Sequence, residues 1–247
     1  FTTNYDYLFE LAFEYHNINY IDGFVGSFEP FFSPPTVEDL RSLPEYHKLW
    51  KLHGSLGRAY DDVNRKIIRR DQKDNAIIVF PNILKYDNSK KQPYVSFIDR
   101  LMKFISADDG ILIICGYSFG DQHINETILT ALESTKGSHV IGLYFDDLLE
   151  ESPAAELAKN QPKLSLYGKR NAVIGGKYGK WKLKTEPSKD DSIQIDYYFD
   201  EDAAVPSEGS TSSSDWTGEG IFKLPDFEQF VNFLSSQVYE HSGVSTK

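Results

Sequence analysis

The run Ile111–Cys115 is apolar at every position. An uninterrupted apolar run of this length is typical of a parallel strand buried on both faces, so we expect it at the centre of a sheet. A glycine turn at Gly116–Gly120 follows, Asp121 can cap the next helix, and residues 139–145 form another apolar run. Strand, glycine turn, helix and strand in this order predict a doubly wound α/β sheet.

Apolar residues at helical spacing indicate further helices. In the first of these, Leu8, Leu11, Ala12 and Tyr15 form one stripe, and Asp6 can cap its start. The other helices are predicted over residues 94–106, 121–132 and 225–240. Short strands are predicted over 47–53, 76–80 and within 164–183, whereas 20–46 and 57–75 are interpreted as irregular.

These elements predict an α/β fold with a Rossmann-like parallel sheet, helices on both of its faces, and a small C-terminal extension. The Rossmann-like domain is placed at residues 1–160 and is expected to be incomplete at its N-terminus, because the chain opens at Phe1 without an initiator methionine. The extension, residues 161–247, comprises the short strands, a loop over 200–220 and the closing helix. Serine, glycine and acidic residues dominate that loop, so we expect it to be mobile.

The charge of the chain argues against several partners. Lysine plus arginine number 26 and aspartate plus glutamate number 37, which gives a formal net charge of −11. An acidic chain gains no counterion-release affinity for DNA or RNA, so direct nucleic-acid binding is not expected. The one basic cluster is interpreted as a solvated face; it consists of Arg65, Lys66, Arg69 and Arg70. Neither a membrane-length apolar run nor a signal peptide is visible, so a cytoplasmic location and no membrane contact are expected.

The chain has one cysteine, Cys115. A single cysteine excludes an intramolecular disulfide and a four-thiolate zinc site, and we expect no metal. Because Cys115 ends an apolar run, it is interpreted as a small hydrophobic residue of a strand, without a catalytic role.

The turn Thr3-Asn4-Tyr5-Asp6 is the first candidate for chemistry, at the junction of a predicted strand and helix. Ligands of open α/β sheets bind beyond the carboxyl ends of the strands. Asn4 offers both a donor and an acceptor there, which can hold a carboxamide or a water aimed at a sugar carbon. The structural alternative is that Asp6 only caps the helix and Asn4 closes a turn.

The second candidate turn is Leu52-His53-Gly54-Ser55. His53 follows an apolar strand and precedes a glycine, so its ring can face a cleft at the strand end. Neutral imidazole can accept a proton from a ribose hydroxyl or from a water near neutral pH. The alternative is a buried histidine that is hydrogen-bonded to backbone.

The third candidate turn is Gly116-Tyr117-Ser118, which opens a helix. Its glycine allows close backbone approach to a phosphate or ribose, Ser118 adds a hydroxyl, and the helix N-terminus points free amides at the same place. The turn differs from the usual dinucleotide fingerprint. Gly142 lies inside the next strand, just before Tyr144, and suggests that an adenine ring or a neighbouring helix approaches the backbone.

Taken together, the three motifs in this order resemble the sirtuin superfamily. Residues 1–6 look like that family's Asn/Asp nicotinamide-pocket motif, Lys51–Gly54 look like its catalytic His-Gly, and Gly116–Ser118 look like its Gly-Thr-Ser ribose and phosphate turn. Residues 140–144 stand where the family has its late adenosine-binding strand. The residues of these motifs most resemble those of the sirtuin-like domains of bacterial anti-phage defence proteins, and Val173–Trp181 also resemble the C-terminal part of those domains.

This resemblance implies an NAD hydrolase that releases nicotinamide and ADP-ribose and depletes NAD in phage defence. It implies catalytic roles for Asn4 and His53. The residues that it implies in NAD binding are Thr3, Asp6, Gly116, Tyr117, Ser118, Gly142 and Tyr144. The partners that it implies are further copies of the chain and a HerA-type ATPase or an Argonaute-type protein.

Sirtuin deacylases carry a four-cysteine zinc module, which a chain with one cysteine cannot build, and this favours NAD hydrolysis over deacylation. The family's Gly-Ala-Gly phosphate loop is expected before Phe1 and is not in this chain. Two other functions stay open: a non-catalytic NAD or ADP-ribose sensor that scaffolds a complex, and a deacylase without zinc. The resemblance requires Asn4, His53 and Ser118 to converge on one cleft.

Overall fold

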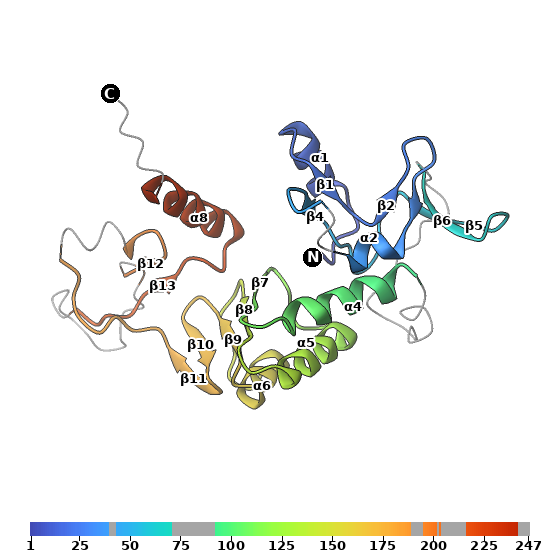
Figure 1. Cartoon of the computed structure of the whole chain (residues 1–247). Coiled ribbons are helices and arrows are strands. Elements are labelled where there is room, and N and C mark those ends of the chain that lie inside the picture. Colours follow the sequence, from blue (N-terminus) through green and yellow to red (C-terminus); the bar gives the residue numbers. More distant parts are fainter. Residues whose placement is uncertain (40–42, 71–91, 189–194, 202, 204–215, 242–247) are drawn as a thin grey trace, which may run out of the picture. The chain divides into compact units, whose positions relative to one another are not determined.

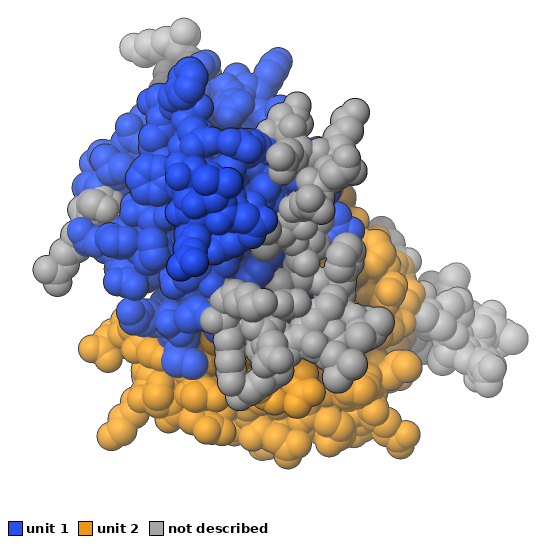
Figure 2. Space-filling view, turned by 90° about the vertical axis from the view of Figure 1, so that its right-hand side faces the viewer, with its two compact units in different colours: residues 1–104 blue, residues 105–247 orange. Residues whose placement is uncertain are grey.

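The computed structural model describes residues 1–39, 43–70, 92–188, 195–201, 203 and 216–241. Within that part the chain forms two compact units, which comprise residues 1–104 and 105–247 (Figure 2). Helices and strands are mixed along the chain (Figure 1), which confirms the predicted α/β class. None of the helices in the described ranges is both long enough and apolar enough to cross a bilayer.

The first unit combines short strands with helices. Its helices are α1 (Leu8–Tyr15), α2 (Pro34–Glu38) and α4 (Tyr94–Ile105). Its strands are β1 (Tyr20–Ile21), β2 (Phe24–Val25), β3 (Phe31–Phe32), β4 (His47–Lys48), β5 (Arg58–Asp61) and β6 (Lys66–Arg69). The helices predicted near 8–15 and 94–106 are confirmed, whereas the strand predicted over 76–80 lies outside the described residues.

Two parallel pairings order the segments that lead to Asn4 and His53. β1 pairs with β4 in parallel, and farther along the same segment Lys51 pairs with Thr2 in a parallel bridge. The Thr2 N–H donates to the Trp50 carbonyl over 2.9 Å, and the Leu52 N–H donates to the Thr2 carbonyl over 2.8 Å. The strand predicted over 47–53 therefore consists of β4 followed by this bridge.

Strands β5 and β6 form an antiparallel hairpin within a four-stranded sheet of order β2-β3-β6-β5. Asp61 starts the turn of the hairpin, because its Oδ1 accepts the N–H of Val63 at 3.0 Å. Ile67 and Ile68 of β6 are buried. The expectation of irregular structure is therefore wrong over the hairpin, and it is also wrong over the short elements β1, β2, β3 and α2. The sequence features that indicate the hairpin are Asp61, which can start a turn, and the adjacent apolar residues Ile67 and Ile68.

Three residues of the basic cluster, Lys66, Arg69 and Arg70, are paired with acids. Lys66 and Arg70 bind the Glu29 carboxylate at 2.9 and 2.6 Å, and Arg69 binds Asp22 at 2.5 Å. The two bonds lower the pKa of Glu29, because both cations stabilise its ionised form. Two carboxylates of the same unit, Glu29 and Asp22, thus balance part of the positive charge of the cluster.

The core of the first unit is aromatic. Phe97 of α4 is fully buried, stacks on Trp50 with ring centroids 5.8 Å apart, and meets the edge of Phe32 at 5.6 Å. The buried Arg58 guanidinium lies 4.9 Å from the Phe24 ring centroid and 5.2 Å from that of Phe97. Ring faces attract a cation that has been removed from water, so these rings stabilise Arg58 inside the unit.

Helix α1 presents its apolar stripe to solvent. Leu8, Leu11 and Tyr15 are 69%, 59% and 83% exposed, and no residue of α1 is buried. Glu10 points the other way, and its carboxylate lies 2.6 Å from the ammonium of the buried Lys51. The periodicity of the apolar residues correctly predicted a helix, but these residues lie on the outer face.

The second unit is built on a five-stranded sheet of order β11-β10-β9-β8-β7. Its strands are β7 (Ile111–Cys115), β8 (His139–Leu143), β9 (Leu164–Tyr167), β10 (Asn171–Ile174) and β11 (Lys177–Lys180). β7, β8 and β9 are parallel and β10 and β11 are antiparallel, so the sheet is mixed. Helix α5 (Gln122–Ser134) connects β7 to β8, as the strand–helix–strand order predicted, whereas α6 (Pro153–Asn160), which connects β8 to β9, was not predicted.

Within the described ranges strand β7 lies at the edge of this sheet and is partly exposed, so the expectation of a central strand buried on both faces is wrong for the part of the chain that the structure describes. Ile111 and Ile113 are 59% and 46% exposed, whereas Leu164 and Leu166 of β9 are fully buried. Among the described strands, β7 pairs with β8 alone. An apolar run predicts a strand, but the order of strands depends on pairings with segments elsewhere in the chain.

The predicted boundary at residue 160 stays a prediction, and sheet pairing continues across it, because β9 pairs with β8. β12 (Phe199–Asp200) and β13 (Ile221–Phe222) pair antiparallel on the two sides of the predicted 200–220 loop. Most of that loop, residues 202 and 204–215, lies outside the described residues. The closing helix α8 runs from Phe227 to His241 and starts two residues later than predicted.

Gly142 of β8 touches a flat side chain, as its place inside a strand suggested. That side chain is the ring of Phe119, from the turn after β7. A Cβ at Gly142 would lie 3.0 Å from the Phe119 ring and 2.5 Å from Leu166 Cδ2. Packing within the unit therefore accounts for this glycine, and its part in binding a nucleotide stays a prediction.

We expect Gly142→Ala to lower the free energy of unfolding by about 1–3 kcal/mol, because the added methyl group overpacks buried side chains. Chemical denaturation of the purified protein measures this change. The matched control is Gly179→Ala in β11, where a Cβ would meet nothing within 4 Å, and its effect should stay within about 0.5 kcal/mol. Equal stabilities of the two variants would contradict the packing account.

Candidate functional site

The parallel bridge between Thr2 and Lys51 brings the first two predicted turns to one edge of the first unit. Parallel strands point their carboxyl ends the same way, and ligands of such sheets bind beyond those ends. Asn4 stands two residues after Thr2, and His53 stands two residues after Lys51. The two residues predicted to be catalytic therefore stand at equivalent positions, each two residues beyond the paired Thr2 and Lys51.

The first turn is held by its own polar groups. Asn4 is exposed, and its backbone N–H donates to Thr2 Oγ1 over 3.0 Å. Thr3 is half-buried. Asp6 Oδ1 accepts the N–H of Leu8 at 2.9 Å, so its carboxylate caps the start of α1, as the structural alternative for this residue held. A role of Asp6 in ligand binding would have to coexist with this bond.

His53 occupies a tight turn that is completed by a glycine. The Gly54 N–H donates to the Lys51 carbonyl over 3.2 Å, and Gly54 has φ +90°, a conformation that other residues rarely adopt. His53 itself is half-buried. The Leu56 N–H then donates to the Tyr5 carbonyl over 3.1 Å, which ties the second turn to the first.

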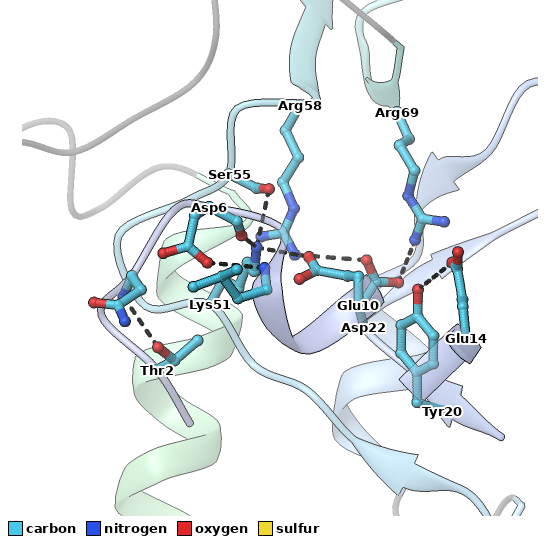
Figure 3. Close-up of polar contacts among 12 residues, drawn as sticks. Thr2, Asp6, Glu10, Glu14, Tyr20, Asp22, Lys51, Ser55, Arg58 and Arg69 are labelled. Carbon is cyan, nitrogen blue, oxygen red and sulfur yellow. Dashed lines mark hydrogen bonds and ion pairs between the residues drawn. The ribbon is translucent and has the colours of Figure 1, made fainter. Parts of the chain in front are cut away.

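The Lys51 side chain lies beneath both turns (Figure 3). It is 1% exposed, and its ammonium donates to the backbone carbonyl of Asp6, contacts Ser55 Oγ at 3.3 Å and pairs with Glu10 at 2.6 Å. One side chain thus contacts the first turn, the second turn and the inner face of α1. Burial lowers the pKa of Lys51, while the Glu10 carboxylate opposes that shift.

A chain of alternating charges continues from Lys51 into the unit (Figure 3). Beyond Glu10 lies Arg58, which is 2% exposed and whose Nη2 is 3.6 Å from an Asp22 carboxylate oxygen. Asp22 also binds Arg69 at 2.5 Å. Burial lowers the pKa of Arg58, and Asp22 opposes this effect. The Arg58 Nη1 and Nη2 atoms make no hydrogen bond within the described part of the chain, so the charge of Asp22 and the rings of Phe24 and Phe97 stabilise this cation.

The third turn leaves β7 beside the end of β8 in the second unit. Cys115 is in register with Leu143, so Gly116 and Tyr144 follow at the same edge of the sheet. Gly116 has φ +68°, and a Cβ there would meet nothing within 4 Å. Ser118 is exposed. An open backbone beside an exposed hydroxyl is what close approach by a phosphate or ribose requires.

Tyr117 stabilises this turn. Its hydroxyl lies 2.9 Å from Asn125 Oδ1 and 3.0 Å from the Asp121 carbonyl, and Asn125 Nδ2 donates to the Phe119 carbonyl over 2.8 Å. Burial, and to a lesser degree Asp121, raises the pKa of Tyr117. The Asp121 carboxylate accepts the His123 N–H at 2.9 Å, which confirms the predicted helix cap.

Asn4, Thr3, Asp6 and His53 belong to the first unit, and the third turn belongs to the second. The structure brings residues together within each group, whereas the predicted convergence of Asn4, His53 and Ser118 stays a prediction. Among the residues in the described ranges, no three histidine, cysteine or acidic side chains gather as a potential metal site.

Sequence reasoning identified the turns but missed the side chains that hold them, which are those of Lys51, Glu10 and Arg58. One signal for Lys51 was available. It stands alone as a charged residue within Leu49-Trp50-Lys51-Leu52, an otherwise apolar stretch that leads to His53. A lone lysine in a buried strand must find acceptors inside the fold.

Cys115 is half-buried at the end of β7, and burial raises the pKa of its thiol. A raised pKa lowers the thiolate fraction at any given pH, and the thiolate is the reactive form. We therefore expect iodoacetamide to modify Cys115 more slowly in the native protein than in concentrated urea at the same mildly alkaline pH. Mass spectrometry of the single cysteine measures both rates, and a native rate equal to the denatured rate would contradict this prediction.

In a comparison with protein families, a family model described as SIR2-like domain matches residues 1–166. A comparison with curated proteins gives no match. The matched range contains all three turns and ends within β9.

Proposed function

Because this chain belongs to the SIR2-like domain family, whose members use NAD, we propose that it hydrolyses NAD at the nicotinamide–ribose bond and releases nicotinamide and ADP-ribose. The observation that carries the proposal is the parallel bridge between Thr2 and Lys51, which places Asn4 and His53 at one strand edge. We further propose that this activity depletes NAD as an effector of anti-phage defence.

The reaction separates a neutral nicotinamide from a ribose whose anomeric carbon becomes positively charged. A catalyst of this step supplies polar groups that are already in place and a positioned water. In the proposal Asn4 holds that water or the ribose, and His53 accepts a proton from the water or from a ribose hydroxyl. Asp6 contributes on the nicotinamide side.

In the same proposal the turn after β7 holds the ribose–phosphate portion of NAD. The open backbone at Gly116 and the exposed hydroxyl of Ser118 support this role. The Tyr117 hydroxyl supports it further, because its proton is shared between Asn125 Oδ1 and the Asp121 carbonyl and so ties the turn to the start of α5 before a ligand arrives.

Hydrolysis is favoured over protein deacylation by the cysteine content. One cysteine cannot form the four-cysteine zinc module that the sirtuin deacylases carry. A deacylase would consume NAD only in the presence of an acylated peptide, and a sensor would bind NAD without releasing nicotinamide. An assay of nicotinamide release without peptide therefore separates all three functions.

Assembly into homo-oligomers is part of the proposal. The exposed apolar side chains of Leu8, Leu11 and Tyr15 on α1 support it, because exposed apolar patches mark protein interfaces. A partner ATPase of the HerA type or an Argonaute-type protein is a second proposed partner. Measuring NAD consumption with and without the product of the neighbouring gene tests that partnership.

We expect Asn4→Ala and His53→Ala each to lower the rate of nicotinamide release by at least about 100-fold, because each removes a polar group that acts on the reacting ribose. Chromatographic measurement of nicotinamide from the intact protein gives the rates. Thermal unfolding should be nearly unchanged, since Asn4 is exposed and His53 is only half-buried.

The matched controls are His16→Ala and Asn232→Ala, which replace exposed residues of the same types elsewhere. Both controls should release nicotinamide at the parent rate. Normal turnover in Asn4→Ala and His53→Ala would refute their roles, and a parent protein that binds NAD without turnover would refute hydrolysis.

A further inference from the structure

We propose that Lys51 is the positioning residue of this site: its ammonium holds the Asn4–Asp6 turn and the His53 turn in their working arrangement. This inference rests on the proposed NAD hydrolysis. Lys51 acts through the backbone and hydroxyl groups that it binds, and its role is distinct from those of Asn4 and His53.

The contacts of Lys51 join segments that are far apart in the sequence. The ammonium binds the Asp6 carbonyl at the end of the first turn and reaches Ser55 Oγ, at 3.3 Å, at the end of the second. Its own backbone carbonyl accepts the Gly54 N–H at 3.2 Å, so its main chain and its side chain both define the turn that carries His53.

Glu10 supplies the charge that keeps this ammonium inside the unit. Its carboxylate lies 2.6 Å from Lys51 Nζ, with side-chain exposures of 13% and 1% respectively. The Tyr7 ring centroid lies 5.4 Å from the same ammonium and adds a cation–π attraction. A fixed cation with several directional partners sets positions more narrowly than apolar contacts do, because each hydrogen bond has a required direction.

A lysine in this place could also serve stability alone, and the two roles predict different results. Lys51→Met keeps the length of the side chain and removes the ammonium, which leaves the half-buried Glu10 carboxylate without its cation and destabilises the fold. Adding Glu10→Gln removes that uncompensated charge. The double variant should therefore regain much of its stability while Asp6 and Ser55 remain unbound.

The experiment compares the parent, Lys51→Met, Glu10→Gln and the double variant by thermal unfolding and by the kinetics of nicotinamide release from NAD. If Lys51 positions the site, kcat of the double variant stays about 100-fold below the parent although its unfolding temperature recovers. If Lys51 serves stability alone, kcat recovers together with the unfolding temperature, and the inference is overturned.

The matched control is Lys159→Met with Glu156→Gln on α6, which removes a comparable ion pair of 2.9 Å on the surface of the second unit. This control should keep the parent kcat.

Hydrogen exchange keeps the test independent of turnover. Amides of residues 2–8 and 51–57 should exchange faster in the double variant than in the parent, because the Leu56–Tyr5 and Leu52–Thr2 bonds lose their support. A parent protein without nicotinamide release would refute the proposed function while this exchange still reports on Lys51. Unchanged exchange in both segments would refute the positioning role even if the parent is active.

Discussion

The arrangement of Asn4 and His53 depends on one ammonium group that has been removed from water. The dehydration of Lys51 is unfavourable, and its compensation comes from the Asp6 carbonyl, the Ser55 hydroxyl and the Glu10 carboxylate. These acceptors belong to segments that are separated in the sequence. The ammonium is satisfied only when all of them are in place, so the two turns and α1 are constrained together.

Similar local features occur in both units. In the second unit a strand, a glycine with positive φ and an aspartate at the start of a helix follow one another on one segment, whereas in the first unit the glycine and the aspartate come from two segments joined by the Thr2–Lys51 bridge. Gly54 has φ +90° and Gly116 has φ +68°. Asp6 and Asp121 each accept the N–H of the residue two positions later at 2.9 Å. Backbone shape and helix caps therefore set these turns, and the side chains proposed for catalysis and binding are attached to a rigid frame.

Features that depend on neighbours in the sequence were predictable. The strand at Ile111–Cys115 and the cap at Asp121 follow from apolar continuity and from side-chain reach, and both are present. Asn4 and His53 were proposed from their places at predicted strand ends together with the resemblance to the sirtuin superfamily. The α/β class followed from the order of strand, turn and helix.

Features that depend on distant segments were not predictable in the same way. The edge position of β7 is set by which strands pair with it. On α1 the Glu10 carboxylate pairs with Lys51, whereas Leu8 and Leu11 of the predicted apolar stripe are exposed. The place of Phe119 against Gly142 required knowledge of how the turn after β7 packs on β8. The periodicity of apolar residues predicts whether a segment is a helix or a strand. Strand order, the face of a helix that is exposed and contacts between elements depend on two segments at once, so one segment's pattern does not predict them.

Helix α1 divides its two faces between different tasks. Its inner face offers Glu10 to Lys51, and its outer face leaves Leu11 and Tyr15 in water. Any protein that covered the outer face would restrain the same helix whose inner face fixes the turn at Asp6. Binding at the outer face and the arrangement of the Asp6 turn at the inner face would then be coupled equilibria. The free energy by which binding favours that arrangement equals the free energy by which the arrangement favours binding. Through such a helix, a protein bound at the outer face can change the arrangement of Asn4 and His53 without a domain movement.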